Sequence, residues 1–152
     1  MTIKNDKIRI LGKGITALAL KDKFPNATLY DDKDFENYDL QSEELTVVSP
    51  GIPPYNNMVL NSKNILSDYD LFKNIIPFSI WISGTNGKTT TTQMCQHLLN
   101  QYNSVCGGNI GIPLSHMNEK APIWILETSS FTLHYTNKSK PNIYLLLPIS
   151  ED

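Results

Sequence analysis

The sequence predicts an α/β fold in two units, each built on parallel strands. Short apolar runs alternate with stretches of helical spacing, which is the pattern of strand–helix–strand units. Two glycine-rich turns, GKG at residues 12–14 and SGTNGKTT at residues 83–90, each follow an apolar run and precede a helical stretch. We therefore expect a Rossmann-like domain with a parallel sheet over residues 1–75, followed by part of a P-loop α/β domain over residues 76–152.

The order of apolar runs and turn residues predicts the individual elements. The first unit is expected to contain strands at residues 7–11, 27–30, 45–48 and near 64–66, with a helix at 15–23 and a helical turn at 68–73. Pro77 marks the boundary between the units, around residues 74–77. The second unit is expected to contain strands at residues 78–83, 104–106, 123–127 and 142–147, with a helix at 88–101.

Composition restricts the function without specifying it. With 40% apolar and 18% charged residues and a net charge of -2, the chain is an ordinary soluble globular sequence. It has no basic stripe for nucleic acid and no apolar stretch long enough for a bilayer, so we expect a cytoplasmic protein with neither partner. Cys95 and Cys106 lack metal-ligand spacing and are expected to be reduced thiols, and His97, His116 and His134 form no metal motif.

The first glycine turn has the pattern of a diphosphate-binding turn. Gly12 and Gly14 follow a strand, Ala17 follows three residues later, and Asp31 and Asp32 close the next strand. Glycines let the backbone approach a diphosphate, and an acidic residue at this distance can accept hydrogen bonds from a ribose. A second loop at residues 49–51 leaves the third strand at the same sheet edge, which favours a binding crevice over a turn that uses glycine only for its conformation.

The second glycine loop is a variant of the phosphate-binding loop G-x-x-x-x-G-K-[ST]. Gly87, Lys88 and Thr89 are present, but Ile82 stands where the first glycine is expected. The backbone N–H groups of the loop can still hold phosphate oxygens, Lys88 can reach the β- and γ-phosphates, and the Thr89 hydroxyl can bind Mg²⁺. The alternative is a Gly/Asn/Thr loop that only caps a helix, but strand, loop, lysine and helix occur in the order that phosphate binding requires.

The variant GTNGKTT resembles the loop of the Mur ligase superfamily, whose members form amide bonds with ATP. The blocks GGNIG at residues 107–111 and ETSSF at residues 127–131 are similar to those of the members that add D-glutamate to UDP-N-acetylmuramoyl-L-alanine during peptidoglycan precursor synthesis. LGKGITALAL, SPGIPP and SDYDLF in the first half resemble the same members, so the resemblance covers essentially the whole chain. It implies a carbon–nitrogen ligase that acts through an acyl phosphate.

The resemblance also implies roles for individual residues. Lys88 would act on the phosphates, Glu127 would be a magnesium ligand together with Thr89, and Asn109 would contact the muramoyl substrate or organise the metal site. The ATP triphosphate would be held by Gly84, Thr85, Asn86, Gly87, Lys88, Thr89 and Thr90. The UDP pocket of the first unit would be lined by Gly14, Ile15, Thr16, Asp31, Ser49 and Gly51.

The family pattern implies further parts that these 152 residues do not include. A second magnesium-binding histidine would follow Glu151 and Asp152, and the modified lysine, the rest of the central domain and a carboxyl-terminal domain would come later. We therefore expect an amino-terminal fragment that is inactive by itself, keeps weak affinity for the UDP-sugar, and self-associates through exposed sheet edges. The complete enzyme is expected to be a monomer.

Other functions remain open at this point. The ligase that adds L-alanine would carry a different block after Glu127. A P-loop NTPase or kinase is expected to present an aspartate at the end of the neighbouring strand, where this chain has Glu127. A nicotinamide-binding Rossmann domain joined to a phosphate loop would bind NADH.

Overall fold

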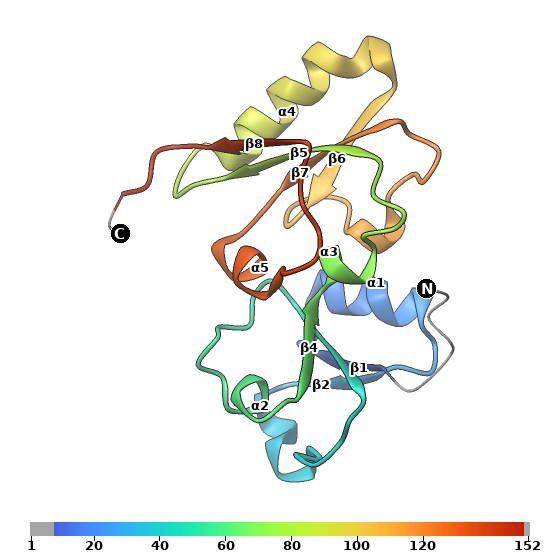
Figure 1. Cartoon of the computed structure of the whole chain (residues 1–152), viewed down its shortest axis with the longest axis vertical. Coiled ribbons are helices and arrows are strands. Elements are labelled where there is room, and N and C mark those ends of the chain that lie inside the picture. Colours follow the sequence, from blue (N-terminus) through green and yellow to red (C-terminus); the bar gives the residue numbers. More distant parts are fainter. Residues whose placement is uncertain (1–7, 151–152) are drawn as a thin grey trace.

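Two four-stranded sheets, all of whose strands are parallel, form the frame of the molecule in the computed structural model, which describes residues 8–150. The first sheet has the strand order β2-β1-β3-β4 and the second has the order β6-β7-β5-β8. In Figure 1 the first sheet lies in the lower half and the second in the upper half. The predicted α/β fold with parallel sheets is confirmed.

The first sheet and its helices occupy the first half of the chain. Its strands are β1 (Ile8–Leu11), β2 (Thr28–Tyr30), β3 (Leu45–Val48) and β4 (Asn64–Ser67). Its helices are α1 (Ile15–Lys23), the 3₁₀ helix η1 (Asp32–Asn37), α2 (Asn57–Leu60) and α3 (Asp68–Leu71). The helical turn predicted at 68–73 is thus shorter, the predicted strand residue Lys7 lies outside the described residues, and η1 and α2 were not predicted.

The second sheet begins directly after the predicted boundary. Its strands are β5 (Phe78–Ser83), β6 (Ser104–Gly108), β7 (Ile123–Glu127) and β8 (Ile143–Leu146). The helices are α4 (Lys88–Leu99), η2 (Asn100–Tyr102), η3 (Leu114–His116) and α5 (Ser130–Tyr135). The predicted helix at 88–101 therefore ends at Leu99 and continues as a 3₁₀ turn, and β6 is longer than predicted because it reaches Gly108.

The strands of the second sheet send alternate side chains into two separate cores. Ile80, Ile82 and Ile125 point to the face covered by α4, where the free thiols Cys95 and Cys106 also pack. Trp81, Trp124 and Leu126 point to the other face and join a core that includes Ile10 and Leu20 of the first unit. The hydrophobic core therefore runs continuously from one unit to the other.

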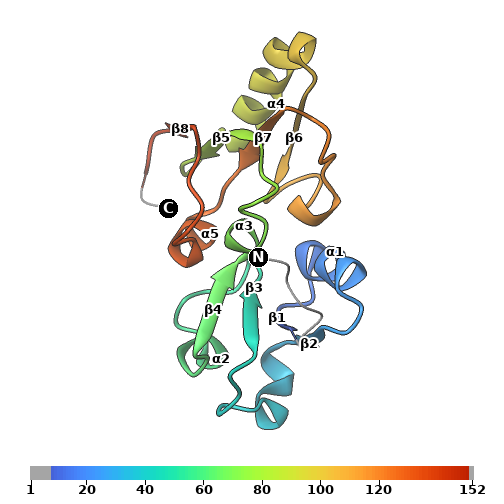
Figure 2. The same ribbon diagram turned by 45° about the vertical axis from the view of Figure 1, so that its right-hand side comes forward.

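Helices α3 and α5 lie between the two sheets (Figures 1 and 2). The Ser67 and Thr136 hydroxyls are 2.7 Å apart, and the Tyr135 hydroxyl donates to the Ile52 carbonyl at 3.0 Å. Because the core and these bonds cross the boundary, the division into residues 1–75 and 76–152 stays a prediction.

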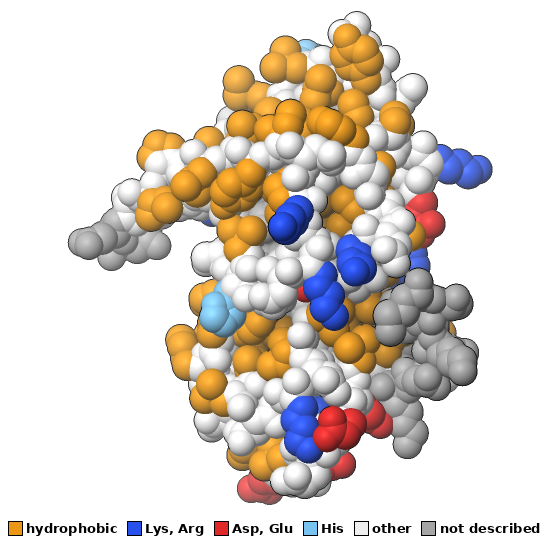
Figure 3. Space-filling model, in the orientation of Figure 1, with side chains coloured by type: hydrophobic (Ala, Val, Ile, Leu, Met, Phe, Trp, Pro, Cys, Tyr) orange, Lys and Arg blue, Asp and Glu red, His pale blue; other side chains and the backbone are white. Residues whose placement is uncertain are grey.

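The outer side of the second sheet carries exposed apolar residues. Leu98 of α4 and Leu146 of β8 are 70% and 57% exposed, and Figure 3 shows hydrophobic side chains over this part of the molecule. None of the helices between residues 8 and 150 has the length and apolar character that a membrane crossing requires.

Candidate active site

The phosphate loop connects β5 to α4 and has a backbone that requires glycine at two positions. Gly84 has φ +138° and Gly87, the residue before α4, has φ +81°. A Cβ atom at Gly84 would lie 2.7 Å from Leu147 Cβ, so this position has no room for a side chain. The loop therefore leads into the amino end of a twelve-residue helix, where backbone N–H groups are free to bind an anion.

Lys88 is folded back over this loop. Its ammonium donates to the carbonyls of Gly84 at 2.7 Å and Thr85 at 2.9 Å, and its side chain is half-buried. This arrangement places a positive charge beside the N–H groups of the loop. An anionic ligand in the loop would gain both the charge and the N–H donors.

Thr89, in the first turn of α4, meets Glu127, at the end of β7. β7 pairs directly with β5, with Ile82 opposite Glu127, so the carboxylate at the end of β7 lies beside the first turn of α4. The Thr89 hydroxyl donates to Glu127 Oε2 at 2.8 Å. The Glu127 side chain is buried, and its other oxygen, Oε1, has no hydrogen-bond partner among the described residues.

A buried carboxylate oxygen without a partner is costly unless a ligand completes it. A hydroxyl and one carboxylate next to a phosphate loop are the ligands with which proteins commonly hold Mg²⁺, and bound phosphates and water supply the rest. Among residues 8–150 no group of three or more His, Cys, Asp or Glu side chains could hold a metal ion. Thr89 and Glu127 therefore fit a magnesium ion that is shared with a phosphate ligand.

Asn109 is joined to the same carboxylate residue through the backbone. Its N–H donates to the Glu127 carbonyl at 2.8 Å, just beyond the pairing of Gly108 with Glu127. Its half-buried side chain makes no hydrogen bond with other described residues. The structure thus brings together Thr89, Glu127 and Asn109, with Lys88 adjacent in the chain.

One neighbour of the phosphate loop was not predicted from the sequence. The Thr85 N–H donates to the Pro148 carbonyl at 3.3 Å, and the Thr85 hydroxyl accepts from the Ser150 N–H at 3.1 Å. The segment after β8 therefore packs on the phosphate loop. These residues have no motif of their own, and only the order of the strands brings them here.

The first glycine turn and the loop after β3 pack directly together. Gly12 has φ +111°, and a Cβ atom there would lie 2.9 Å from the Ser49 side chain. The Ser49 hydroxyl is buried and has no hydrogen-bond partner among the described residues. The two predicted loops thus meet at the carboxyl edge of the first sheet, with a free hydroxyl between them.

Of the two aspartates after β2, Asp31 faces the glycine turn. Lys13 in that turn lies 3.1 Å from Asp31 and 2.8 Å from Asp34, while Asp32 accepts a hydrogen bond from Asn56 at 2.7 Å. The pKa of Lys13 is raised, chiefly by its hydrogen bond to Asp34 and next by that to Asp31. Lys13 is exposed, and Asp31 and Asp34 are half-buried.

The other predicted residues of this pocket lie around the same turn. Gly14 is the residue before α1, and Ile15 and Thr16 begin that helix. Ile15 is 74% exposed, and Gly51 in the loop after β3 is also exposed. An exposed isoleucine at the mouth of a glycine turn leaves apolar surface available to a ligand.

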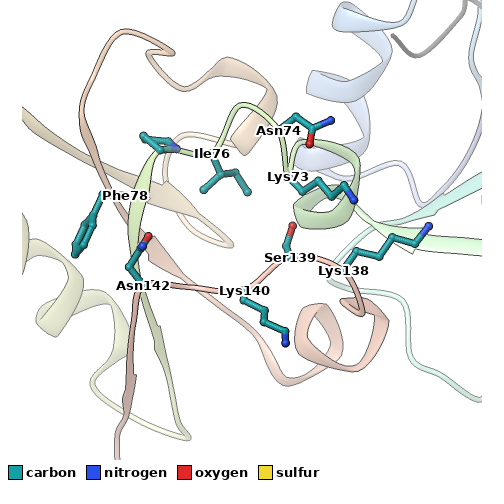
Figure 4. A pocket seen from close by; sticks show the side chains of 9 residues that line it. Lys73, Asn74, Ile76, Phe78, Lys138, Ser139, Lys140 and Asn142 are labelled. Carbon is teal, nitrogen blue, oxygen red and sulfur yellow. The ribbon is translucent and has the colours of Figure 1, made fainter. Parts of the chain in front are cut away.

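A separate open hollow of about 490 Å³ lies at the opposite end of β5 (Figure 4). It is lined by Phe78 and Asn142 and by three lysines, Lys73, Lys138 and Lys140. Figure 3 shows lysine side chains gathered in this middle region. Phe78 begins β5, whereas the phosphate loop follows its last residue, so the hollow is distinct from the site at Glu127.

Comparison with known proteins shows which ligases the chain is similar to. Residues 82–152 match the Mur ligase middle domain. The chain is 48% identical to the UDP-N-acetylmuramoylalanine–D-glutamate ligase of Campylobacter jejuni strain RM1221 over 96% of this chain and 41% of the relative. It is 44% identical to the ligase of the same name from Helicobacter pylori strain J99, over 96% of this chain and 40% of the relative.

A solved structure supports the fold. The UDP-N-acetylmuramate:L-alanyl-γ-D-glutamyl-meso-diaminopimelate ligase of Neisseria meningitides has a TM-score of 0.53 and 17% identity, over 96% of this chain and 61% of that chain. The chain spans about two fifths of the length of the curated relatives named above. With the phosphate loop, the GGNIG block and the buried Glu127 in one site, residues 82–152 are similar to the middle domain of the Mur ligases.

Proposed function

We propose that the chain contributes the UDP-sugar site and the ATP phosphate site of a cytoplasmic ligase that joins D-glutamate to UDP-N-acetylmuramoyl-L-alanine. The contact of Thr89 with the buried, half-satisfied carboxylate of Glu127 carries this proposal, because it supports a metal and phosphate site on the phosphate loop. The names of the relatives from Campylobacter jejuni and Helicobacter pylori support the choice of substrates.

The proposed reaction must bring two anions together. The γ-phosphoryl group of ATP is transferred to the carboxylate of UDP-N-acetylmuramoyl-L-alanine, which gives an acyl phosphate and ADP. The amine of D-glutamate then attacks the acyl carbon, and inorganic phosphate leaves. Carboxylate and triphosphate repel each other, so the site must neutralise charge and fix their geometry.

The residues of the phosphate loop are proposed to perform these tasks. Lys88 moves its two hydrogen bonds from the loop carbonyls to phosphate oxygens, while the N–H groups at the end of the loop and in the first turn of α4, residues 86–90, hold the triphosphate. Asn109 presents its free side-chain amide to the muramoyl substrate. Mg²⁺, when bound, supplies further positive charge between the reacting anions, and Thr89 and Glu127 are the residues that would hold it.

The first unit is proposed to bind the UDP part of the substrate. Its donors are the free Ser49 hydroxyl and the N–H groups at the start of α1, and Asp31 is placed to accept hydrogen bonds from the ligand. The residues assigned to this pocket are Gly14, Ile15, Thr16, Asp31, Ser49 and Gly51.

A substrate panel on the complete gene product tests the proposal. We expect release of phosphate from ATP only when UDP-N-acetylmuramoyl-L-alanine and D-glutamate are both present. Release that depends instead on UDP-N-acetylmuramate and L-alanine would assign the protein to the L-alanine-adding ligases. A fluorescence change of NADH on binding, without ATP-dependent ligation, would favour the nicotinamide-binding alternative.

A further inference from the structure

The hydroxyl of Tyr69 lies in the second unit, although the residue belongs to α3 of the first. It donates to the Glu127 carbonyl at 3.1 Å and lies 3.2 Å from the Thr128 hydroxyl. The ring stands edge-on to Trp81 of β5, with ring centroids 4.7 Å apart. Tyr69 is 1% exposed, so its hydroxyl forms its hydrogen bonds with protein groups next to the proposed metal ligand and not with water.

The Glu127 carbonyl receives two donors, one from each unit. The Asn109 N–H donates to it at 2.8 Å from the second unit, and the Tyr69 hydroxyl donates from the first. Three residues that matter for the site therefore meet at one oxygen atom. A carbonyl oxygen has two lone pairs, and these two donors use both.

The backbone around this oxygen leaves no space for movement. Gly108 has φ +106°, and a Cβ atom there would lie 2.6 Å from the Glu127 carbonyl oxygen and 2.9 Å from the Tyr69 hydroxyl. The Thr128 N–H also donates to the Ile82 carbonyl at 2.9 Å. Glu127 is the last residue of β7, so these contacts determine the direction in which its side chain leaves the sheet.

Helix α3 is itself fastened to the second unit on its other side. The buried Asp70 carboxylate accepts three backbone N–H groups, from Asn137 at 2.8 Å, Lys138 at 2.8 Å and Ser139 at 2.7 Å. The Ser139 hydroxyl donates to the Tyr69 carbonyl at 2.6 Å. Carboxylate bonds to several N–H groups are among the stronger hydrogen bonds, so α3 is a rigid base for Tyr69.

We propose that Tyr69 is a positioning residue of the phosphate site, whose hydroxyl fixes the main chain at Glu127 and thereby the direction of that carboxylate. The inference rests on the proposed function, in which Glu127 is a metal ligand. Among the contacts that join the unit proposed to hold the UDP-sugar to the unit proposed to hold ATP, this hydroxyl is the one that reaches the main chain of Glu127. Groups that orient a metal ligand from outside its coordination shell commonly change metal affinity or activity by about 10- to 100-fold when removed.

The test compares Tyr69→Phe with Tyr38→Phe in the complete gene product. Tyr38 is also buried, but its hydroxyl lies 2.5 Å from the Ser62 hydroxyl and so has its hydrogen-bond partner within the first unit. Both variants lose one buried tyrosine hydroxyl, so thermal unfolding should show similar, modest losses of stability. A purely structural role would leave the two variants alike in every other respect.

Two readouts separate a positioning role from a structural one. The first is the Mn²⁺ concentration that half-saturates the protein with a non-hydrolysable ATP analogue, measured by electron paramagnetic resonance against a nucleotide blank. The second is the rate of D-glutamate-dependent phosphate release. For Tyr69→Phe we expect a roughly tenfold higher Mn²⁺ requirement and a roughly tenfold lower kcat, with KM for the UDP-sugar unchanged. Tyr38→Phe should match the wild type in both.

If Tyr69→Phe shows wild-type Mn²⁺ affinity, or changes it no more than Tyr38→Phe, the positioning role is refuted. A wild-type protein that binds Mn²⁺ and nucleotide but releases no phosphate with D-glutamate would refute the proposed function instead. The Mn²⁺ comparison would then still decide the role of Tyr69.

Discussion

Replacing Gly108 by alanine tests the close contact of Gly108 with the Glu127 carbonyl and the Tyr69 hydroxyl, where the two units meet. This residue has φ +106°, a conformation that L-residues rarely adopt, and a new Cβ atom would lie 2.6 Å from the Glu127 carbonyl oxygen. The new Cβ atom would also lie 2.9 Å from the Tyr69 hydroxyl. One neighbour is backbone at the end of the strand β7, which is paired on both sides, and the other is the hydroxyl of a buried tyrosine, so neither can move away cheaply.

Two costs add in the Gly108→Ala variant. The strained backbone costs about 1–3 kcal/mol, and overpacking of a filled site costs about another 1–3 kcal/mol. We therefore expect a loss of roughly 4 kcal/mol, which for a protein of this size lowers Tm by roughly 10 °C. The assay is thermal unfolding followed by circular dichroism, together with urea unfolding.

Gly111→Ala is the matched control in the same GGNIG block. Its φ is +81°, but nothing lies within 4 Å of the new Cβ atom, so only the backbone cost of about 1–2 kcal/mol applies. If both variants lose the same stability, the close approach of Gly108 to Glu127 and Tyr69 is not what requires the glycine. Such a result would refute the geometry on which the junction depends.

Three other predictions follow from the described contacts. Lys88→Met should weaken ATP binding by roughly tenfold or more, because a charged donor to the phosphates is lost. UDP-sugar binding, measured by calorimetry, should stay unchanged. Equal losses for both ligands would contradict the assignment of Lys88 to the ATP phosphates. Burial raises the pKa of Asp68 to about 7 from 3.8, so the folded state takes up a proton that the unfolded state releases, and stability should fall as pH rises between about 4 and 7. Asp68→Asn should remove that slope, so its free energy of unfolding, measured with urea, should rise relative to that of the wild type by roughly 3 kcal/mol between pH 5 and pH 8. Parallel pH profiles for the two proteins would refute the raised pKa of Asp68. Asp70→Ala should cost roughly 3 kcal/mol or more, because three N–H groups lose their acceptor, and a loss below about 1 kcal/mol would show that α3 is not held there.

The sequence predicted the elements that have strong periodicity. The helix at Ile15–Lys23 and the strands Leu45–Val48, Phe78–Ser83 and Ile123–Glu127 lie where the apolar runs place them. The helices that were missed are short: η3 has 3 residues, and η1, α2 and α5 have 6, 4 and 6. The three longer ones each follow a residue whose side chain accepts a backbone N–H: Asp31, Asn56 or Ser129. Such short helices depend on their caps and on tertiary packing, which a search for periodicity does not detect.

The site was predictable in its residues more than in its geometry. Lys88 and Thr89 follow from the phosphate loop, whereas Glu127 was assigned through the family resemblance. Its contact with Thr89 depends on β7 lying beside β5, and that order cannot be read from local sequence. Tyr69 stands in the block SDYDLF that supported the resemblance, but its role depends on a contact with a residue 58 positions later.

Replacing Glu127 by glutamine removes the charge and keeps the shape of the side chain, so it tests whether this carboxylate holds the metal ion at the phosphate site. In the complete gene product with UDP-N-acetylmuramoyl-L-alanine, ATP and Mg²⁺, we expect D-glutamate-dependent phosphate release to fall by about 100-fold or more, with higher Mg²⁺ restoring part of the rate. Phosphate release by Glu127→Gln at the wild-type rate and with the wild-type Mg²⁺ requirement would contradict the assignment of this carboxylate to the metal and phosphate site.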